Sequence, residues 1–213
     1  MGAVVLSRIY PRLGLASAVS IACYPVRLMP STHKNWVKTL VIRGARPDDA
    51  EFMREMLFEA TYWRSASTTK PRPELNEGLA HPDLAKVLAG WGRPGDLAMI
   101  ATDGAGERIG AAWMRLWTVA DHTRGFVDPQ TPELGIGVRK EFRRHGVGTA
   151  LLLAVLGRAR EERVPRVSLG VEIENVARLL YERFGFQLHS VNQGVATLQV
   201  VLDDSAPDTE RSG

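Results

Sequence analysis

Arg143-Arg144-His145-Gly146-Val147-Gly148-Thr149 is the stretch of sequence that decides the fold. It follows a β-rich run and precedes a long apolar segment, which predicts a turn between a strand and a helix. Small residues at 146 and 148 let main-chain N–H groups approach a ligand, and a helix start adds unpaired N–H groups and partial positive charge. With its two arginines, the stretch has what a pyrophosphate requires. A plain tight turn with solvated arginines is the alternative.

Two other phosphate-binding motifs fit this stretch poorly. A P-loop requires Lys and then Ser or Thr after its second glycine, whereas Thr149-Ala150 follow here. A dinucleotide-binding fingerprint requires a third glycine, and Leu151 stands in its place. Glu172 lies at a plausible distance for the acidic residue of that fingerprint. A nucleotide-binding oxidoreductase is therefore disfavoured but stays open.

The strand expected before the turn carries a second signal. Alternation along Pro132–Val138 puts Glu133, Gly135 and Gly137 on one face and three aliphatic residues on the other. Two glycines on one strand face indicate that a ligand or another backbone passes close by. The alternative is a glycine bulge with a surface glutamate.

A third segment, Asn175–Phe186, predicts a capped helix. Asn175 suits the N-cap, and Gly185 suits the position after the last helical residue. Ala177, Leu180, Tyr181 and Phe184 fall on one helix face. By itself this pattern makes Tyr181 an aromatic residue of the core.

The remaining periodicity predicts an α+β fold with a mixed, mostly antiparallel sheet of six to seven strands flanked by helices. Strands are expected at Leu40–Arg43, Leu97–Thr102, Arg108–Trp117, Pro132–Arg139, Arg166–Ile173, Phe186–Ser190 and Val195–Leu202. Helices are expected at Arg46–Trp63, Pro82–Trp91, Gly146–Arg163 and Asn175–Phe184. We expect one domain over residues 39–203, followed by a polar tail at 204–213.

Residues 1–38 differ from the rest of the chain. They contain five of the 27 basic residues and none of the 24 acidic ones, so the net charge of +3 belongs to this segment and a nucleic-acid binder is not expected. Its apolar stretch, residues 13–23, is about half the ~20 residues that cross a bilayer. We interpret residues 1–38 as an extension outside the fold, either an organellar presequence or a start placed ahead of Met29.

Cysteine and histidine usage narrows the chemistry. Cys23 is the single cysteine, so no intramolecular disulfide can form, which favours a reducing compartment and a cytoplasmic location. The five histidines are scattered without ligand spacing, so no metal site is expected. Trp63 and Trp91 flank a proline-rich segment and are candidates for an apolar wall, with the core as the alternative.

Together these segments resemble the GCN5-related N-acetyltransferase superfamily. Its cofactor signature, Arg/Gln-x-x-Gly-x-Gly/Ala, is matched by Arg143, Gly146 and Gly148. Its second signature is matched by Asn175, Ala177, Leu180-Tyr181 and Gly185-Phe186. The order of elements agrees over roughly three quarters of the chain.

The resemblance implies an enzyme that moves an acetyl group from acetyl-CoA to a primary amine of a small molecule, amino acid or peptide by direct attack. It implies Tyr181 as the acid that protonates the leaving thiolate, and Glu133 is the candidate base. The residues implied to hold acetyl-CoA are Ile136, Gly137, Val138, Arg143, Arg144, His145, Gly146, Val147, Gly148, Thr149 and Asn175. No membrane partner is expected, and the chain is expected to be a monomer or homodimer. A module that binds acyl-CoA without transferring it is the alternative.

Overall fold

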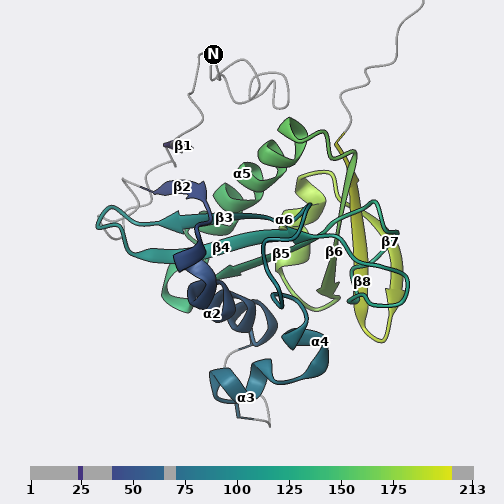
Figure 1. The fold of residues 1–213 in the computed structure, drawn as a ribbon, viewed down its shortest axis with the longest axis horizontal. Coiled ribbons are helices and arrows are strands. Elements are labelled where there is room, and N and C mark those ends of the chain that lie inside the picture. Colours follow the sequence, from purple (N-terminus) through teal and green to yellow (C-terminus); the bar gives the residue numbers. More distant parts are fainter. Residues whose placement is uncertain (1–23, 26–39, 65–70, 203–213) are drawn as a thin grey trace, which may run out of the picture. The chain divides into compact units, whose positions relative to one another are not determined.

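The computed structural model describes residues 24–25, 40–64 and 71–202. The leading segment 1–38 and the tail 204–213 predicted from the sequence lie outside these residues, apart from Tyr24–Pro25. The described helices and strands follow one another in an order close to that expected from hydrophobic periodicity (Figure 1).

The strands form one mixed sheet. In spatial order they are β1 (Tyr24–Pro25), β2 (Val41–Gly44), β3 (Leu97–Thr102), β4 (Arg108–Arg115), β5 (Glu133–Val138), β6 (Arg166–Glu172), β8 (Val195–Val201) and β7 (Gln187–Asn192). β5 and β6 are parallel, because a helical crossover joins them, whereas β1–β2, β2–β3, β6–β8 and β7–β8 are antiparallel. The predicted α+β fold is confirmed, and the two-residue β1 adds to the seven predicted strands.

The helices also lie close to their predicted places, except that the helix expected over Pro82–Trp91 ends at Ala85. They are α2 (Ala50–Thr61), α3 (Leu75–Leu79), α4 (Pro82–Ala85), α5 (Val147–Glu161) and α6 (Ala177–Arg183), with 3₁₀ turns η2 (Pro47–Asp49) and η3 (Lys140–Phe142). The sequence did not predict α3, since five residues are too few to show a helical period. Among the described helices we find none with the length and apolar character that a membrane crossing requires.

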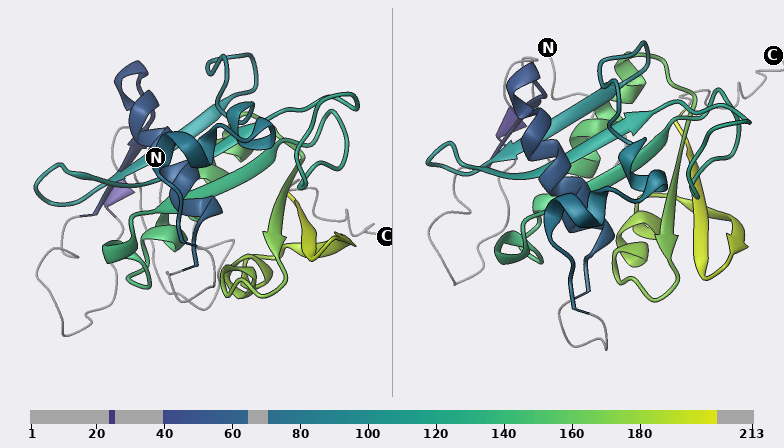
Figure 2. Two further views of the ribbon diagram at one scale, coloured as in Figure 1. Left: turned by 90° about the horizontal axis from the view of Figure 1, so that it is seen from below. Right: turned by 60° about the horizontal axis from the view of Figure 1, so that its bottom comes forward.

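The chain divides into two compact units, and β4, β5 and α5 each contribute to both. The first unit comprises residues up to Leu75, Ala98–Ala112 and Ile136–Ala154. Within it, α2 and α5 cover opposite faces of the strands (Figure 2). Gly137 of β5 faces the backbone of Met56 in α2, whereas Gly110 of β4 faces Leu151 of α5. The loop between η3 and α5 belongs to this unit.

A buried carboxylate fixes the start of α2 in the same unit. Asp49 is fully buried and accepts hydrogen bonds from the Arg43 guanidinium at 2.6 and 2.9 Å and from the Arg46 N–H at 2.8 Å. Arg108 of β4 adds a longer contact of 3.2 Å. Although burial opposes ionisation, these donors lower the pKa of Asp49 to about 2. The carboxylate therefore joins β2, η2 and β4.

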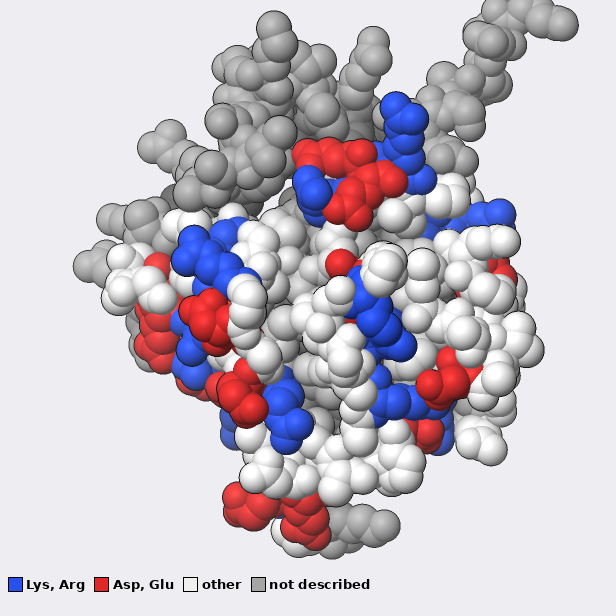
Figure 3. All heavy atoms as spheres, in the orientation of Figure 1, with Lys and Arg blue, Asp and Glu red and all other residues white. Residues whose placement is uncertain are grey.

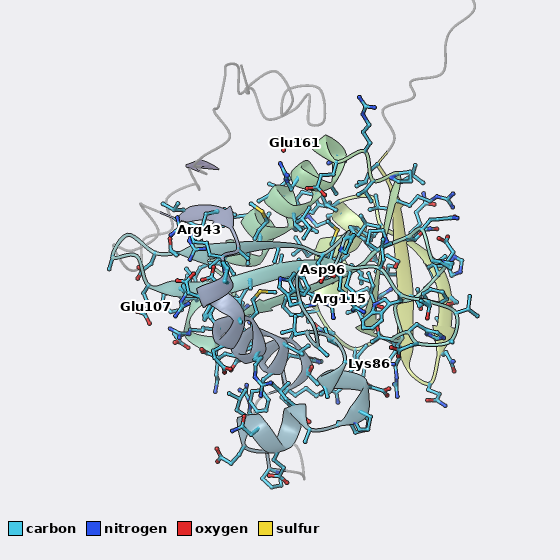
Figure 4. All side chains as sticks on the ribbon, in the orientation of Figure 1. Arg43, Lys86, Asp96, Glu107, Arg115 and Glu161 are labelled. Atoms are coloured by element: carbon cyan, nitrogen blue, oxygen red, sulfur yellow. The ribbon has the colours of Figure 1, made fainter. Side chains whose placement is uncertain are left out.

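The second unit comprises Asn76–Leu97, Trp113–Gly135 and residues from Val155 onward. In β6, Val167, Leu169 and Val171 alternate toward a buried face, whereas Ile173, at the end of the predicted strand, is 45% exposed. A fully buried ion pair joins Arg115 of β4 to Asp96 at 2.6 and 2.9 Å (Figure 4). Because Arg115 also donates to two main-chain carbonyl groups after α4, the pair fixes the loop that precedes β3.

Positive and negative side chains are interspersed over the face of the protein shown in Figure 3. On α5, for example, Arg158 pairs with Glu161 at 3.2 Å and with Glu162 at 2.8 Å. Exposed pairs of this kind contribute little to stability. This face thus carries mixed charge, in keeping with the placement of the excess basic residues before residue 39.

Candidate functional site

The loop from Arg143 to Thr149 presents main-chain N–H groups at the start of α5. Arg144 and Gly146 both have left-handed backbone conformations, with φ of 62° and 86°. Ala150 is the first helical residue whose N–H bonds back along the chain, to Gly146 O at 3.0 Å. The N–H groups of Val147, Gly148 and Thr149 precede any acceptor within the helix. Together with the helix dipole, they make the loop suited to an anionic group.

The packing of the described residues does not require glycine at position 148. A Cβ atom added there would meet only Val138 Cγ2, at 4.0 Å. Its backbone is helical, where alanine is favoured over glycine. Gly146, by contrast, has a φ of 86° that side chains other than glycine rarely adopt. Among the described residues nothing therefore explains a glycine at 148, which leaves room beside the first N–H groups of α5.

The Arg143 guanidinium is directed at α2 and β5. It donates to Val138 O, to Trp63 O and to Glu59 O, each at 3.0 Å, and to the Glu59 carboxylate at 2.5 Å. Burial lowers the pKa of Arg143 from its usual value. The sequence suggested that this side chain adds charge beside a phosphate, whereas in the structure it binds the end of α2. Of the predicted arginine pair, Arg144 is the exposed one.

The two glycines of β5 have internal explanations. A Cβ on Gly137 would lie 2.0 Å from Met56 O, and one on Gly135 would lie 2.5 Å from the Trp113 indole. The sequence indicated that a ligand or another backbone passes close to this face. At Gly137 the structure shows another backbone, that of Met56 in α2. Ile136 and Val138 are half-buried on the opposite face.

Glu133 is held by the loop that precedes β5. Its carboxylate accepts one hydrogen bond from the Thr123 hydroxyl and another, of 3.0 Å, from the Gly125 N–H. Desolvation raises its pKa, and the two hydrogen bonds and the charges of His122 and Lys86 offset only part of this effect. A carboxylate with a raised pKa suits a general base that works near neutral pH. The same two hydrogen bonds also anchor the loop that precedes β5.

Tyr181 has a structural role at the end of α6. The helix closes with hydrogen bonds from Phe186 N–H to Tyr181 O at 3.1 Å and from Gly185 N–H to Glu182 O at 3.1 Å. The Tyr181 and Phe186 rings meet edge to face at 5.8 Å, the apolar contact that accompanies such an ending. Burial raises the pKa of the Tyr181 hydroxyl to about 12. Tyr181 itself is half-buried, as are the other residues of its face.

Asn175 lies just before α6, which begins two residues later than predicted. Its Oδ1 accepts a hydrogen bond from the Ala177 N–H at 2.9 Å, and its carbonyl oxygen accepts one from the Arg178 N–H at 3.0 Å. The side chain thus satisfies a donor at the helix start, although Val176, and not Asn175 as predicted, occupies the N-cap position.

Each unit brings some of the predicted residues together. The loop residues, Ile136, Gly137 and Val138 lie in the first unit, and Glu133, Asn175 and Tyr181 in the second. Sequence reasoning missed Glu59 and Thr123, which hold Arg143 and Glu133. Arg143 and Glu59 are 84 positions apart, so no local pattern links them.

The sequence model described as "Acetyltransferase (GNAT) family" matches residues 56–186 of this chain. The chain belongs to this family. The matched residues run from α2 to the end of the α6 turn, so they include both predicted motifs. The resemblance inferred from Arg143, Gly146, Gly148 and the Asn175–Phe186 segment is confirmed.

Curated relatives match parts of this GNAT chain. A mycothiol acetyltransferase from Propionibacterium freudenreichii is 32% identical over 125 residues, which cover 58% of this chain and 38% of the relative. An L-methionine sulfoximine/L-methionine sulfone acetyltransferase from Pseudomonas aeruginosa is 33% identical over 97 residues, which cover 45% and 54%. The matched regions thus span about half or less of these relatives' length.

Solved structures support the fold. An N-acetyltransferase from Staphylococcus aureus Mu50 has a TM-score of 0.56 at 18% identity, covering 78% of this chain and 99% of its own. The structure of yncA from Salmonella typhimurium, solved with its cofactor acetyl-CoA, has a TM-score of 0.54 at 22% identity, covering 80% and 99%. A PaiA N-acetyltransferase from Thermoplasma acidophilum was solved with coenzyme A, with a TM-score of 0.54 at 15% identity, covering 76% and 99%.

Proposed function

We propose that this protein transfers an acetyl group from acetyl-CoA to the primary amine of a small molecule, amino acid or peptide. The observation that carries the proposal is the loop before α5, where Gly148 leaves open the space beside the first N–H groups of the helix. Family membership supports the reaction class, and the neighbours solved with acetyl-CoA or coenzyme A support the donor.

In this proposal the loop holds the pyrophosphate. The main chain of Arg143 to Thr149 provides the N–H groups, and the exposed Arg144 adds charge. Arg143 contributes by fixing the loop to α2, because its guanidinium is already bound there. The polar main-chain groups of Ile136, Gly137 and Val138 pair with the pantetheine arm, and Asn175 contacts the same arm.

Acetyl-CoA supplies an activated thioester. The amine nitrogen attacks its carbonyl carbon, the carbon–sulfur bond breaks, and the sulfur leaves as a thiolate that takes a proton. Glu133 accepts the proton that the amine loses, directly or through water, and its raised pKa favours that task. Tyr181 donates a proton or hydrogen bond to the sulfur. Because its pKa is about 12, its hydroxyl stays protonated at neutral pH but is a weak acid toward a thiolate.

The acceptor is proposed to lie against the segment that follows α2, where Trp63 is half-buried. Trp113 and Trp117 are core residues, 3% and 5% exposed, so we do not propose that they contact the acceptor. One curated relative is named for L-methionine sulfoximine and L-methionine sulfone, which supports a small acceptor of the amino-acid class. We also propose a cytoplasmic location from the single cysteine.

One set of observations favours a second candidate, a module that binds acyl-CoA without transferring it. Both oxygens of Glu133 already hold the preceding loop, and the Tyr181 ring already closes α6. On this view both residues are structural. The two candidates share the cofactor loop and differ in whether thiol is released.

Thermal melting and thiol release test the proposal together. Acetyl-CoA and CoA should each raise the melting temperature, whereas NAD and ATP should not. At 100 times its dissociation constant a ligand stabilises the fold by about 2.7 kcal/mol. A thiol-release assay with a panel of amines then identifies transfer. Binding without release from any amine would favour the second candidate, and no binding would refute both.

Tyr181→Phe separates catalysis from structure. The phenyl ring keeps its edge-to-face contact with Phe186, so the melting temperature should stay within a degree or two. Loss of the hydroxyl should lower kcat by about 100-fold if it acts as an acid. Unchanged kcat in a fully folded variant would remove Tyr181 from the mechanism.

A further inference from the structure

Glu59 lies in the last turn of α2, and its carboxylate is shared by two arginines. Oε2 accepts from the Arg143 guanidinium at 2.5 Å, and Oε1 accepts from Arg72 at 2.6 Å. The Glu59 side chain is 14% exposed, so solvent screens these contacts weakly. One negative charge thus lies between two positive charges from segments far apart in the sequence.

The Arg143 side of this network holds the cofactor loop. Besides Glu59, the guanidinium binds Val138 O at the end of β5 and Trp63 O beyond the end of α2. Its bond to Glu59 O caps a carbonyl group in the last turn of the helix, where a positive charge suits the dipole. A displacement of the loop would therefore break the contacts that Arg143 makes at the end of α2.

The Arg72 side holds the segment that leads into α3. The Arg72 guanidinium lies over the Phe58 ring, 4.4 Å from its centroid, and the same ring contacts Tyr62 at 4.8 Å. Arg72 is thus anchored to the end of α2 by a charge and by an aromatic face. Both anchors are neighbours in sequence, Phe58 and Glu59.

We propose that Glu59 is a positioning residue that couples the cofactor loop to the segment around Arg72. The inference rests on the proposed function, in which acetyl-CoA binds the loop and the amine binds after α2. Without the Glu59 charge, two guanidinium groups face one another across a partly buried space, so Arg143 or Arg72 must move. Binding energies linked in this way are reciprocal: acetyl-CoA strengthens amine binding as much as the amine strengthens acetyl-CoA binding.

Hydrogen exchange of the full chain with and without CoA tests the coupling, with CoA affinity measured by calorimetry. In the unaltered protein, CoA should slow exchange in peptides that contain residues 72–75 by about 5-fold or more. In Glu59→Gln, CoA should bind about 5-fold more weakly or worse, and the slowing at residues 72–75 should disappear. Glu51→Gln is the matched control, since Glu51 lies on the same helix and is 87% exposed.

Arg72→Leu separates coupling from simple destabilisation. It leaves the contacts of Arg143 intact, so CoA affinity should stay within about 2-fold, while the CoA-dependent slowing at residues 72–75 is lost. Each variant is compared with itself, with and without CoA, so a general loss of stability cannot mimic this result. CoA binding without slowing in the unaltered protein, or slowing retained in either variant, overturns the coupling alone. Absence of CoA binding overturns the proposed function and the coupling with it.

Discussion

Replacement of Gly148 by alanine should change stability and ligand affinity in opposite directions. The new Cβ atom would meet only Val138 Cγ2 at 4.0 Å, which is ordinary van der Waals contact. The position is helical, and alanine is favoured over glycine inside helices by up to about 1 kcal/mol. Since Gly148 lies in the first turn, we expect about half that gain. In the absence of ligand the melting temperature should therefore rise by about 1–2 °C.

The same methyl group should weaken CoA binding. It would occupy the space beside the N–H groups of Val147, Gly148 and Thr149, where we propose that the pyrophosphate lies. A tenfold rise in Kd corresponds to about 1.4 kcal/mol, half of the stabilisation that CoA gives at 100 times the original Kd. Melting curves with and without CoA, at one fixed CoA concentration, measure both effects in a single experiment.

Either of two results would refute this reasoning. A lower melting temperature without CoA would mean that Gly148 is needed for packing, as Gly137 is. An unchanged CoA-induced shift would mean that the ligand does not approach the chain at Gly148. Gly148→Asp extends the test, because its charge suits the helix start yet repels a phosphate.

Three further predictions concern other residues. Gly137→Ala should lower stability by about 3 kcal/mol, seen in urea denaturation, because its Cβ would lie 2.0 Å from Met56 O. Asp49, with a pKa lowered from 3.8 to about 2, should contribute about 2 kcal/mol above pH 4 that is lost as the pH falls through that interval. About half of this contribution is lost by pH 3, so in Asp49→Asn the difference in stability between pH 7 and pH 3 should shrink by about 1 kcal/mol. Glu133 must be ionised to act as a base and burial raises its pKa, so activity should rise with pH through a value above 4.5, and in Glu133→Gln this rising limb of the pH–rate profile should vanish.

Local sequence patterns predicted most of the fold because each element carries its own signal. The hairpin at Asp103–Gly106 follows from turn residues between two apolar runs, and β3 and β4 flank it. The end of α6 follows from Gly185, whose φ of 87° closes the helix. Helix starts were predicted less well: α2 begins after a 3₁₀ turn, and α6 begins at Ala177. Both starts depend on capping contacts that a periodicity does not contain.

The site could be predicted only as far as its residue types, because identical residues serve different partners. The sequence shows glycine at 135, 137 and 148 alike. In the structure, an indole ring lies against the first and a helix backbone against the second, whereas a Cβ on the third would make only an ordinary contact with a described side chain, Val138, at 4.0 Å. Of the three, Gly148 is the one that the described residues leave unexplained, so we expect its replacement to weaken ligand binding without harming the fold.

Arg143 shows that the sequence also could not predict where a charged side chain points. A motif places an arginine beside the loop, but the direction of its guanidinium depends on Glu59, 84 positions earlier. Because that guanidinium binds α2, the positive potential at the loop must come mainly from main-chain N–H groups and Arg144. Such a site depends on loop geometry more than on net charge. Arg144→Ala should therefore weaken CoA binding less than a change that displaces the loop, such as Glu59→Gln. Calorimetry on the two variants compares them directly, and a larger loss in Arg144→Ala would contradict the argument.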